Sequence, residues 1–379
     1  MVYAITAKKV FDGEAFQSNK AIIIDNNKIK DIIALEDIGN IELINYGDNI
    51  IAPGFIDLQI NGCGGVLFND SISPETIEIM LKTNLSCGTT SFLPTLITAS
   101  ESDVKKAVET ATLMHEKYPH NIIGVHIEGP YISKIKKGIH NPVHMKAISS
   151  EMVDFFVSFA KKIPIKLTLA PEENDVAKIQ QLVDGGVKVS IGHSNANYIQ
   201  AIAGVNAGIS LATHLFNAMS PFEGRNPNVV GAVLNSNSVH AGIIIDGNHV
   251  DFASVALVAK IKKEKLYMVT DAATPMGTDM KEFRFADQLV YVKGDKYVNK
   301  DGTLAGANIN MMESIANAVE KVNLPLSESL KMASLYPANA LGVSKLGRVL
   351  KGYIANLVVF SSDYNLVATI DGGNIINLK

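Results

Sequence analysis

Two histidines and a glutamate stand at the ends of three hydrophobic segments of this sequence. They are Glu128 in Ile-Gly-Val-His-Ile-Glu, His193 in Val-Ser-Ile-Gly-His and His214 in Ser-Leu-Ala-Thr-His. The carboxyl ends of parallel strands converge on one face of an α/β barrel, so these side chains would meet there. Two imidazoles and one carboxylate are a typical ligand set for a catalytic metal, and they leave a fourth position open for water or a substrate oxygen.

A further carboxylate, Asp271, ends the segment Leu-Tyr-Met-Val-Thr-Asp. A bound metal lowers the pKa of water, so that a neighbouring carboxylate can accept its proton near neutral pH. Asp271 would then act as the general base and afterwards deliver the proton to a leaving amine.

Each of these four residues also has an ordinary structural explanation. Glu128 could cap the segment after it, Asp271 could be a helix N-cap, and each histidine could be a hydrogen-bonded core residue. Their joint position at the ends of predicted barrel strands favours one metal site over four unrelated structural roles.

The middle of the chain alternates between strand-like and helical segments. Helical stretches, such as Pro74–Asn84, Ser102–Glu116 and Val176–Val183, separate most of the strand candidates. Alternation at this count predicts an α/β protein with a (β/α)8 TIM-like barrel. The eight predicted strands are Gly54–Ile60, Thr89–Leu96, Ile122–Glu128, Ile165–Ala170, Val187–His193, Ile209–Leu215, Ala241–Asp246 and Leu266–Asp271.

Both ends of the chain contain short strand-like runs bounded by turn residues such as Asp12-Gly13 and Asp371-Gly-Gly. Neither end has enough strands to form a core alone. We therefore expect residues 1–51 and 346–379 to build one small β-sandwich, and residues 52–345 to form the barrel.

Composition narrows the class of protein. The 379 residues are 47% hydrophobic and 19% charged, which suits a large folded core. The net charge of −4 argues against nucleic-acid binding, and no apolar run approaches the roughly 18 residues of a membrane-spanning helix. Only Cys63 and Cys87 occur, and the first residues lack a signal-peptide pattern, so we expect a cytoplasmic protein.

Eight short motifs occur in a fixed order along the chain, and together they are highly specific. On these motifs the sequence resembles the N-acetylglucosamine-6-phosphate deacetylases, a family within the amidohydrolase superfamily, over essentially its whole length. The motifs are Pro53-Gly-Phe-Ile-Asp-Leu-Gln-Ile-Asn-Gly-Cys-Gly-Gly65, Leu93-Pro-Thr-Leu-Ile97, His126-Ile-Glu-Gly-Pro130, Lys137-Gly-Ile-His-Asn-Pro142, Gly192-His-Ser194, Thr213-His-Leu-Phe-Asn-Ala-Met219, Asp246-Gly-Asn-His249 and Val269-Thr-Asp271.

The resemblance implies a role for each matching residue. It makes Glu128, His193 and His214 the metal ligands, Asp271 the catalytic acid/base, and His140 a catalytic contact that polarises the amide carbonyl. The residues that it implies for substrate binding are Ile139, His140, Asn217, Ala218, Arg225, Asp246, Gly247, Asn248, His249, Leu304, Ala305 and Gly306.

Phosphate recognition would fall to Arg225 and His249. An arginine offers several charged donors to phosphate, and the histidine can add another. Without the family match, Arg225 would be read as a surface arginine of a polar loop.

The segment Gln59-Ile-Asn61 departs from the wider superfamily, where His-x-His at the first strand supports a second metal. Amides are poorer ligands than imidazoles for a transition metal, so Gln59 would lie at most beside a vacant second site. We therefore expect one divalent metal per subunit, with Zn²⁺ favoured on ligand type and Fe²⁺ or Co²⁺ also suited to these ligands.

The activity that the resemblance implies is the hydrolysis of N-acetyl-D-glucosamine 6-phosphate to glucosamine 6-phosphate and acetate, in amino-sugar catabolism and cell-wall sugar recycling. The expected partner is thus a small-molecule substrate, within a homodimer in which Arg225 reaches the other subunit's site. Two alternatives are a two-metal cyclic-imide or dihydropyrimidine hydrolase, and a barrel that only binds amino-sugar phosphates. The missing His-x-His argues against the first, and the retained Asp271 and ligands argue against the second.

Overall fold

Eight parallel strands form the centre of the molecule, as the alternating pattern predicted. The computed structural model describes residues 2–378. One parallel bridge, between Ile60 and Ala272, links the first strand to the segment after the last and closes the sheet into a barrel. Around the barrel the strands run in the order β8 (Phe55–Ile60), β11 (Thr89–Ile97), β12 (Val125–Glu128), β13 (Ile165–Leu169), β14 (Lys188–Ile191), β15 (Leu211–Ala212), β16 (His240–Ile243) and β17 (Leu266–Met268).

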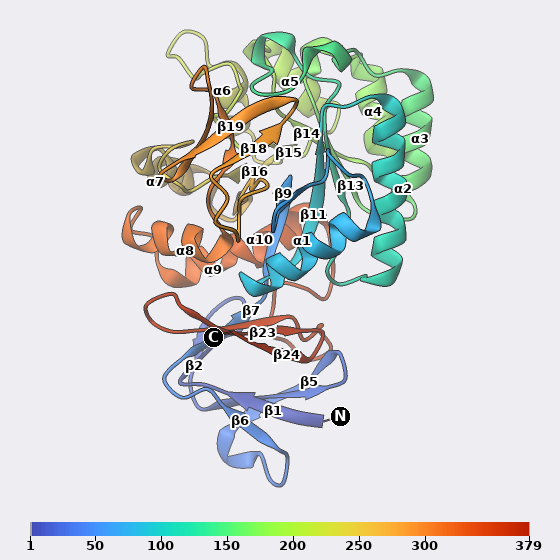
Figure 1. Ribbon diagram of the computed structural model, residues 1–379. Coiled ribbons are helices and arrows are strands. Elements are labelled where there is room, and N and C mark those ends of the chain that lie inside the picture. Colours follow the sequence, from blue (N-terminus) through green and yellow to red (C-terminus); the bar gives the residue numbers. More distant parts are fainter. Residues whose placement is uncertain (1, 379) are drawn as a thin grey trace.

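Helices surround the strands on the outside of the barrel (Figure 1). Several begin where the sequence offers a side-chain cap: the Ser73 hydroxyl accepts from the Thr76 amide, and Asn197 and Asn310 each form a capping box. The helices are α1 (Pro74–Ser86), α2 (Glu101–Lys117), α3 (Ser150–Ala160), α4 (Val176–Asp184), α5 (Tyr198–Asn206), α6 (Asn228–Asn235), α7 (Phe252–Lys262), α8 (Met311–Glu320), α9 (Leu326–Ala333) and α10 (Leu335–Leu341). Within residues 2–378, none of them is long and apolar enough to span a membrane.

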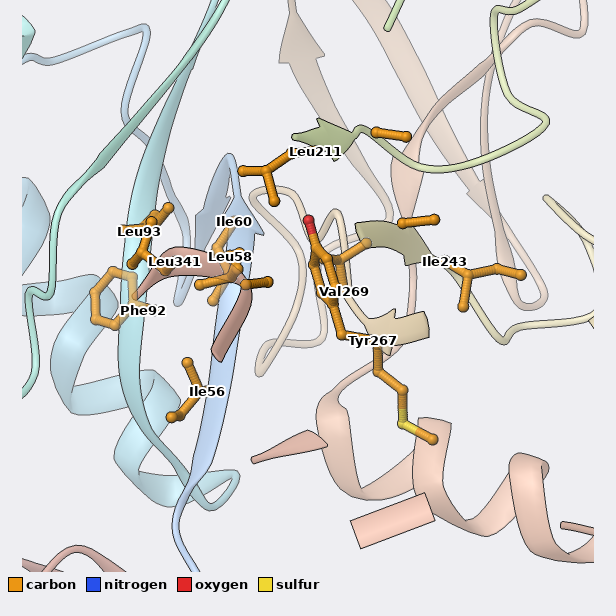
Figure 2. Close-up of a cluster of buried hydrophobic side chains, with 14 of the residues drawn as sticks. Ile56, Leu58, Ile60, Phe92, Leu93, Leu211, Ile243, Tyr267, Val269 and Leu341 are labelled. Atoms are coloured by element: carbon orange, nitrogen blue, oxygen red, sulfur yellow. The ribbon is translucent and has the colours of Figure 1, made fainter. Parts of the chain in front are cut away.

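Apolar side chains of the barrel strands and of the helices around them form one continuous core, while polar side chains such as Lys166 and Thr168 are also buried among the strands. All six residues of β8 are buried, because a parallel strand in a barrel is covered on both faces. Figure 2 shows Leu58 and Ile60 of β8 gathered with Leu93 of β11, Tyr267 of β17 and Leu341 of α10. Burying one such aliphatic side chain stabilises the fold by about 1.5–3 kcal/mol, so this cluster makes the barrel a stiff frame for the site.

The two chain ends meet in a small β-sandwich, which Figure 1 shows at the end of the barrel where β7 leads into β8. Side chains of both sheets, including Ile5, Ile22 and Leu357, share one buried cluster. This confirms the predicted fold class. One sheet has the order β5 (Lys28–Ala34), β4 (Lys20–Asp25), β1 (Val2–Thr6), β6 (Leu43–Asn45); the other has β24 (Asn374–Asn377), β23 (Leu366–Asp371), β22 (Leu357–Phe360), β7 (Ile50–Pro53), β2 (Lys9–Phe11), β3 (Phe16–Gln17).

The predicted division of the chain at residues 51/52 and 345/346 stays a prediction. The strand β7 spans residues 50–53, so the predicted boundary after residue 51 falls within a strand that leads from the sandwich into the barrel. Met1 and Lys379 of the predicted sandwich segments lie outside the described residues.

An antiparallel sheet that the sequence analysis did not predict is inserted between β17 and α8. We call it the flap; its strands are β18 (Glu282–Phe285), β19 (Gln288–Lys293), β20 (Lys296–Asn299) and β21 (Leu304–Ala307). Its buried side chains form a cluster with Ile97 and Ile139 of the barrel. Hydrogen bonds from Asn248 to Asp295 (2.9 Å) and from Gln288 to the Ile139 carbonyl (3.4 Å) fasten it to two barrel loops.

Candidate metal centre and active site

A cavity of 430 Å³ opens at the carboxyl ends of the barrel strands, where the sequence placed the site. The three proposed ligands line it together with Asp271 and His140. Of the residues predicted to contact substrate, Ile139, Asn217, Ala218, His249, Leu304 and Gly306 also line it.

The candidate ligand atoms converge on one point. Glu128 Oε1 lies 2.9 Å from His214 Nε2 and 3.2 Å from His193 Nε2, and the two imidazole nitrogens are 3.1 Å apart. Each of the three residues is at most 4% exposed. Atoms that share a tetrahedral zinc ion at about 2.0–2.1 Å lie roughly 3.3 Å apart, so this spacing fits three ligands of one ion.

Hydrogen bonding shows which ring nitrogen of His193 is available. Its Nδ1 lies 2.8 Å from the Lys136 carbonyl, which can only accept, so Nδ1 carries the proton. The lone pair of Nε2 therefore faces the carboxylate of Glu128, which is itself an acceptor. Two acceptors at this distance repel unless a positive charge, either a proton on Nε2 or a metal ion, lies between them, so the residues present fit a bound divalent metal.

Ionisation also suits Glu128 to ligation. Burial alone would raise its pKa, but the contacts with His193 and His214 hold the pKa well below its usual range. The carboxylate therefore stays charged at neutral pH, as a metal ligand must.

The predicted strand that ends at Glu128 is confirmed at that end, but the strands predicted to reach His193, His214 and Asp271 were drawn too long. The strands end at Ile191, Ala212 and Met268, and the ladder stops before His193, His214 and Asp271. These three residues have positive φ angles of 47°, 29° and 52°. A left-handed backbone costs a non-glycine residue energy, and here it turns each side chain inward from the strand end.

His140 offers a second nitrogen to the metal centre. It groups with Glu128 and His193, with one ligand atom of each within 4.8 Å of the others. However, its Nδ1 lies 2.9 Å from the Thr98 hydroxyl and 3.4 Å from the Thr98 amide, which can only donate. The proton of His140 thus sits on Nε2, which suits a hydrogen-bond donor; the shorter distances favour His214 as the third ligand.

Two amides hold Asp271 in place. Asn61 donates to its Oδ1 at 2.7 Å and Gln59 donates at 2.9 Å. Burial raises the pKa of Asp271, and the charge of Glu128 raises it further, which favours a group that takes up and releases protons. Gln59 also lies 3.3 Å from Glu128 through its nitrogen, so it acts here as a donor to the carboxylates.

The opposite side of the cavity carries polar groups after β15 and β16. Asp246 accepts from His249 Nδ1 at 2.7 Å and from the amides of Asn248 and His249. Burial raises the pKa of Asp246, but these hydrogen bonds from His249 and Asn248 lower it overall, so the carboxylate remains charged. It fixes the ring of His249, whose Nε2 is left for a ligand.

Five predicted contact residues lie away from the cavity lining, among them Asp246, which lies behind His249. Arg225 is exposed in the loop 221–226, and Gly247 is an exposed turn residue with φ 72°. Asn248 binds the flap through Asp295, and Ala305 is packed in the flap cluster.

Sequence reasoning missed several residues that line the cavity, including Asn61, Ile97, Lys136, Phe285 and Thr303. Asn61 could have been found from its place two residues after Gln59 on the first strand. Ile97 and Phe285 look like ordinary core residues in the sequence, so no pattern marked them.

The fold and the site define a hydrolytic enzyme built on a (β/α)8 barrel. Residues 50–376 match the amidohydrolase family, and the chain belongs to this family.

Individual relatives cover nearly the whole chain. The N-acetylglucosamine-6-phosphate deacetylase of Haemophilus influenzae is 43% identical over 378 residues, which cover 98% of this chain and 99% of the relative. An N-acetylgalactosamine-6-phosphate deacetylase of a Shewanella species is 35% identical, with 86% and 83% covered. The crystal structure of N-acetylglucosamine-6-phosphate deacetylase from Pasteurella multocida superposes with a TM-score of 0.97 at 44% identity, covering 100% of both chains.

Proposed function

We propose that this protein hydrolyses the acetamide of N-acetyl-D-glucosamine 6-phosphate to glucosamine 6-phosphate and acetate. The observation that carries the proposal is the single cavity in which Glu128, His193 and His214 converge beside Asp271. The names of the similar enzymes supply the substrate class. We assign the activity to amino-sugar catabolism and cell-wall sugar recycling.

Each residue of the site has a separate role in the proposed reaction. A divalent cation, when bound, would supply Lewis acidity and so lower the pKa of the attacking water. Asp271 takes a proton from that water as its oxygen attacks the amide carbon, and His140 donates a hydrogen bond from Nε2 to the carbonyl oxygen. Asp271 then gives its proton to the amine nitrogen as the C–N bond breaks, and acetate and the free amino sugar result.

We propose one divalent cation per subunit, held by Glu128, His193 and His214. Imidazole and carboxylate ligands favour Zn²⁺, and Fe²⁺ or Co²⁺ fit the same donors. Gln59 supports a single-ion site, because its nitrogen faces the carboxylates at the place where a second ion would need a ligand.

We further propose that the phosphate binds His249 from one subunit and Arg225 from the other subunit of a homodimer. Arg225 is exposed outside its own cavity, and the neighbouring Phe222 is 58% exposed, as suits an interface. A cytoplasmic location accords with the two free cysteines, Cys63 and Cys87.

N-Acetylgalactosamine 6-phosphate is a second candidate substrate, because one of the similar enzymes carries that name. The two sugars differ at one hydroxyl. Acetate release should therefore be measured against both hexosamines, each with and without the 6-phosphate. We expect acetate release from N-acetylglucosamine 6-phosphate and little release from N-acetylglucosamine. Equal release with and without the 6-phosphate, or release only from other amides, would overturn the proposal.

A further inference from the structure

Three apolar side chains from separate elements form one corner of the cavity, which we call the apolar corner. Ile97 ends β11, Ile139 lies in the loop after β12, and Phe285 ends β18 of the flap. All three line the cavity and belong to one buried cluster, with exposed fractions of 2%, 6% and 2%. The apolar corner therefore forms a water-excluded surface beside the polar residues of the site.

The apolar corner adjoins the group that would hold the substrate carbonyl. Ile139 precedes His140, and Ile97 precedes Thr98, whose hydroxyl lies 2.9 Å from His140 Nδ1. The acyl carbon chain is bonded to the carbonyl carbon, so it must lie within a few ångströms of His140 Nε2. The sugar leaves the amide through its nitrogen, and the polar groups suited to it, Asn217 and His249, follow β15 and β16 across the barrel.

We propose that the apolar corner binds the acyl group of the scissile amide and that Phe285 limits the length of that group. This inference rests on the proposed deacetylase function and adds its acyl specificity. Burial of a methyl group against the apolar corner is favourable, because it removes apolar surface from water. A longer chain would press on a close-packed cluster, because Phe285 is held by Phe283, whose ring centroid is 6.2 Å away and which itself packs edge-on against Tyr297 at 5.2 Å.

The experiment compares Phe285→Ala with Phe283→Ala in the metal-loaded protein. Both variants remove a phenyl ring from β18 and from the same cluster, but only Phe285 lines the cavity. The measured quantity is kcat/KM for N-propionyl- and N-butyryl-glucosamine 6-phosphate relative to the N-acetyl compound. One methylene in an apolar pocket changes discrimination about 10- to 200-fold, so Phe285→Ala should raise the propionyl/acetyl ratio at least tenfold. Phe283→Ala removes a support of Phe285 but no atom of the cavity lining, so it should raise the ratio clearly less than Phe285→Ala does.

A second variant keeps the proposal testable if Phe285→Ala prevents the flap from folding. Ile97→Ala enlarges the apolar corner from the barrel side and changes no residue of the flap itself, and it should raise the same ratio in the same direction. If the unaltered protein releases no acetate, the proposed function has failed. If it releases acetate while neither Phe285→Ala nor Ile97→Ala changes the ratio, or Phe283→Ala changes it equally, the acyl group does not bind at the apolar corner.

Discussion

Replacing Asp271 by asparagine separates the proposed base from the ligands. The substitution keeps the size of the side chain, and its carbonyl oxygen can still accept from Asn61 and Gln59, which donate to Oδ1 at 2.7 and 2.9 Å. The site should therefore keep its shape and its metal. What it loses is the group that takes the proton of the attacking water.

The expected loss follows from that single function. General-base catalysis by a positioned side chain contributes about 10²- to 10⁴-fold, or about 3–5 kcal/mol of transition-state stabilisation. The kcat of Asp271→Asn should fall by this factor, while the bound metal stays near the parent level. The same change at Asp154, on the exposed face of α3, is the matched control and should alter neither quantity.

Acetate release gives kcat, and elemental analysis of the dialysed protein gives the bound metal. Asp271→Asn with more than about a tenth of the parent turnover would refute the assignment of Asp271 as the base. Loss of metal as complete as in His193→Ala would show instead that Asp271 is mainly a ligand.

Three further predictions concern the support of the site, the phosphate and the barrel interior. Glu172 accepts from the Ser194 hydroxyl at 2.6 Å, next to His193, so Glu172→Ala should weaken metal affinity about 10- to 100-fold, with partial recovery in Glu172→Gln; unchanged affinity in a metal titration would contradict this. Arg225→Ala should lower kcat/KM for the phosphorylated sugar by about two to three orders of magnitude and barely affect the unphosphorylated one; equal losses would assign the residue to the fold or the dimer contact alone. Burial lowers the pKa of Lys166 to about 8, so the unfolded chain binds more protons between pH 8 and 10.5. The free energy of unfolding, measured with denaturant, should thus rise by about 3 kcal/mol across that window relative to Lys166→Met, and parallel pH profiles would refute the shift.

The barrel was readable from the sequence because its strands are hydrophobic runs with helices between them. All eight predicted strands exist, and the fold class was correct. The error lay at the ends of several strands: the predicted strand ran over Ile209–Leu215, whereas β15 contains only Leu211–Ala212. The backbone turns left-handed at His214 so that its ring can reach the cavity, and hydrophobicity alone does not report this turn.

The flap was missed for a different physical reason. β18 alternates between exposed and buried residues because the flap is covered on one face only; this pattern indicates a strand, but it lies outside the alternation of strands and helices on which the barrel prediction rested. Phe285 gains its place in the cavity through this tertiary packing, which sequence spacing does not reveal. Arg225 shows a related limit, because its loop follows β15 but the residue lies exposed and outside the cavity lining.

The most direct test of the account is a metal titration of the stripped protein, followed by acetate release from N-acetyl-D-glucosamine 6-phosphate. We expect activity to rise in proportion to bound Zn²⁺ and to reach its maximum at one equivalent per chain, with His193→Ala neither binding the ion tightly nor regaining activity. Activity that climbs until two equivalents are bound, or that survives the removal of metal, would contradict a single site formed by Glu128, His193 and His214.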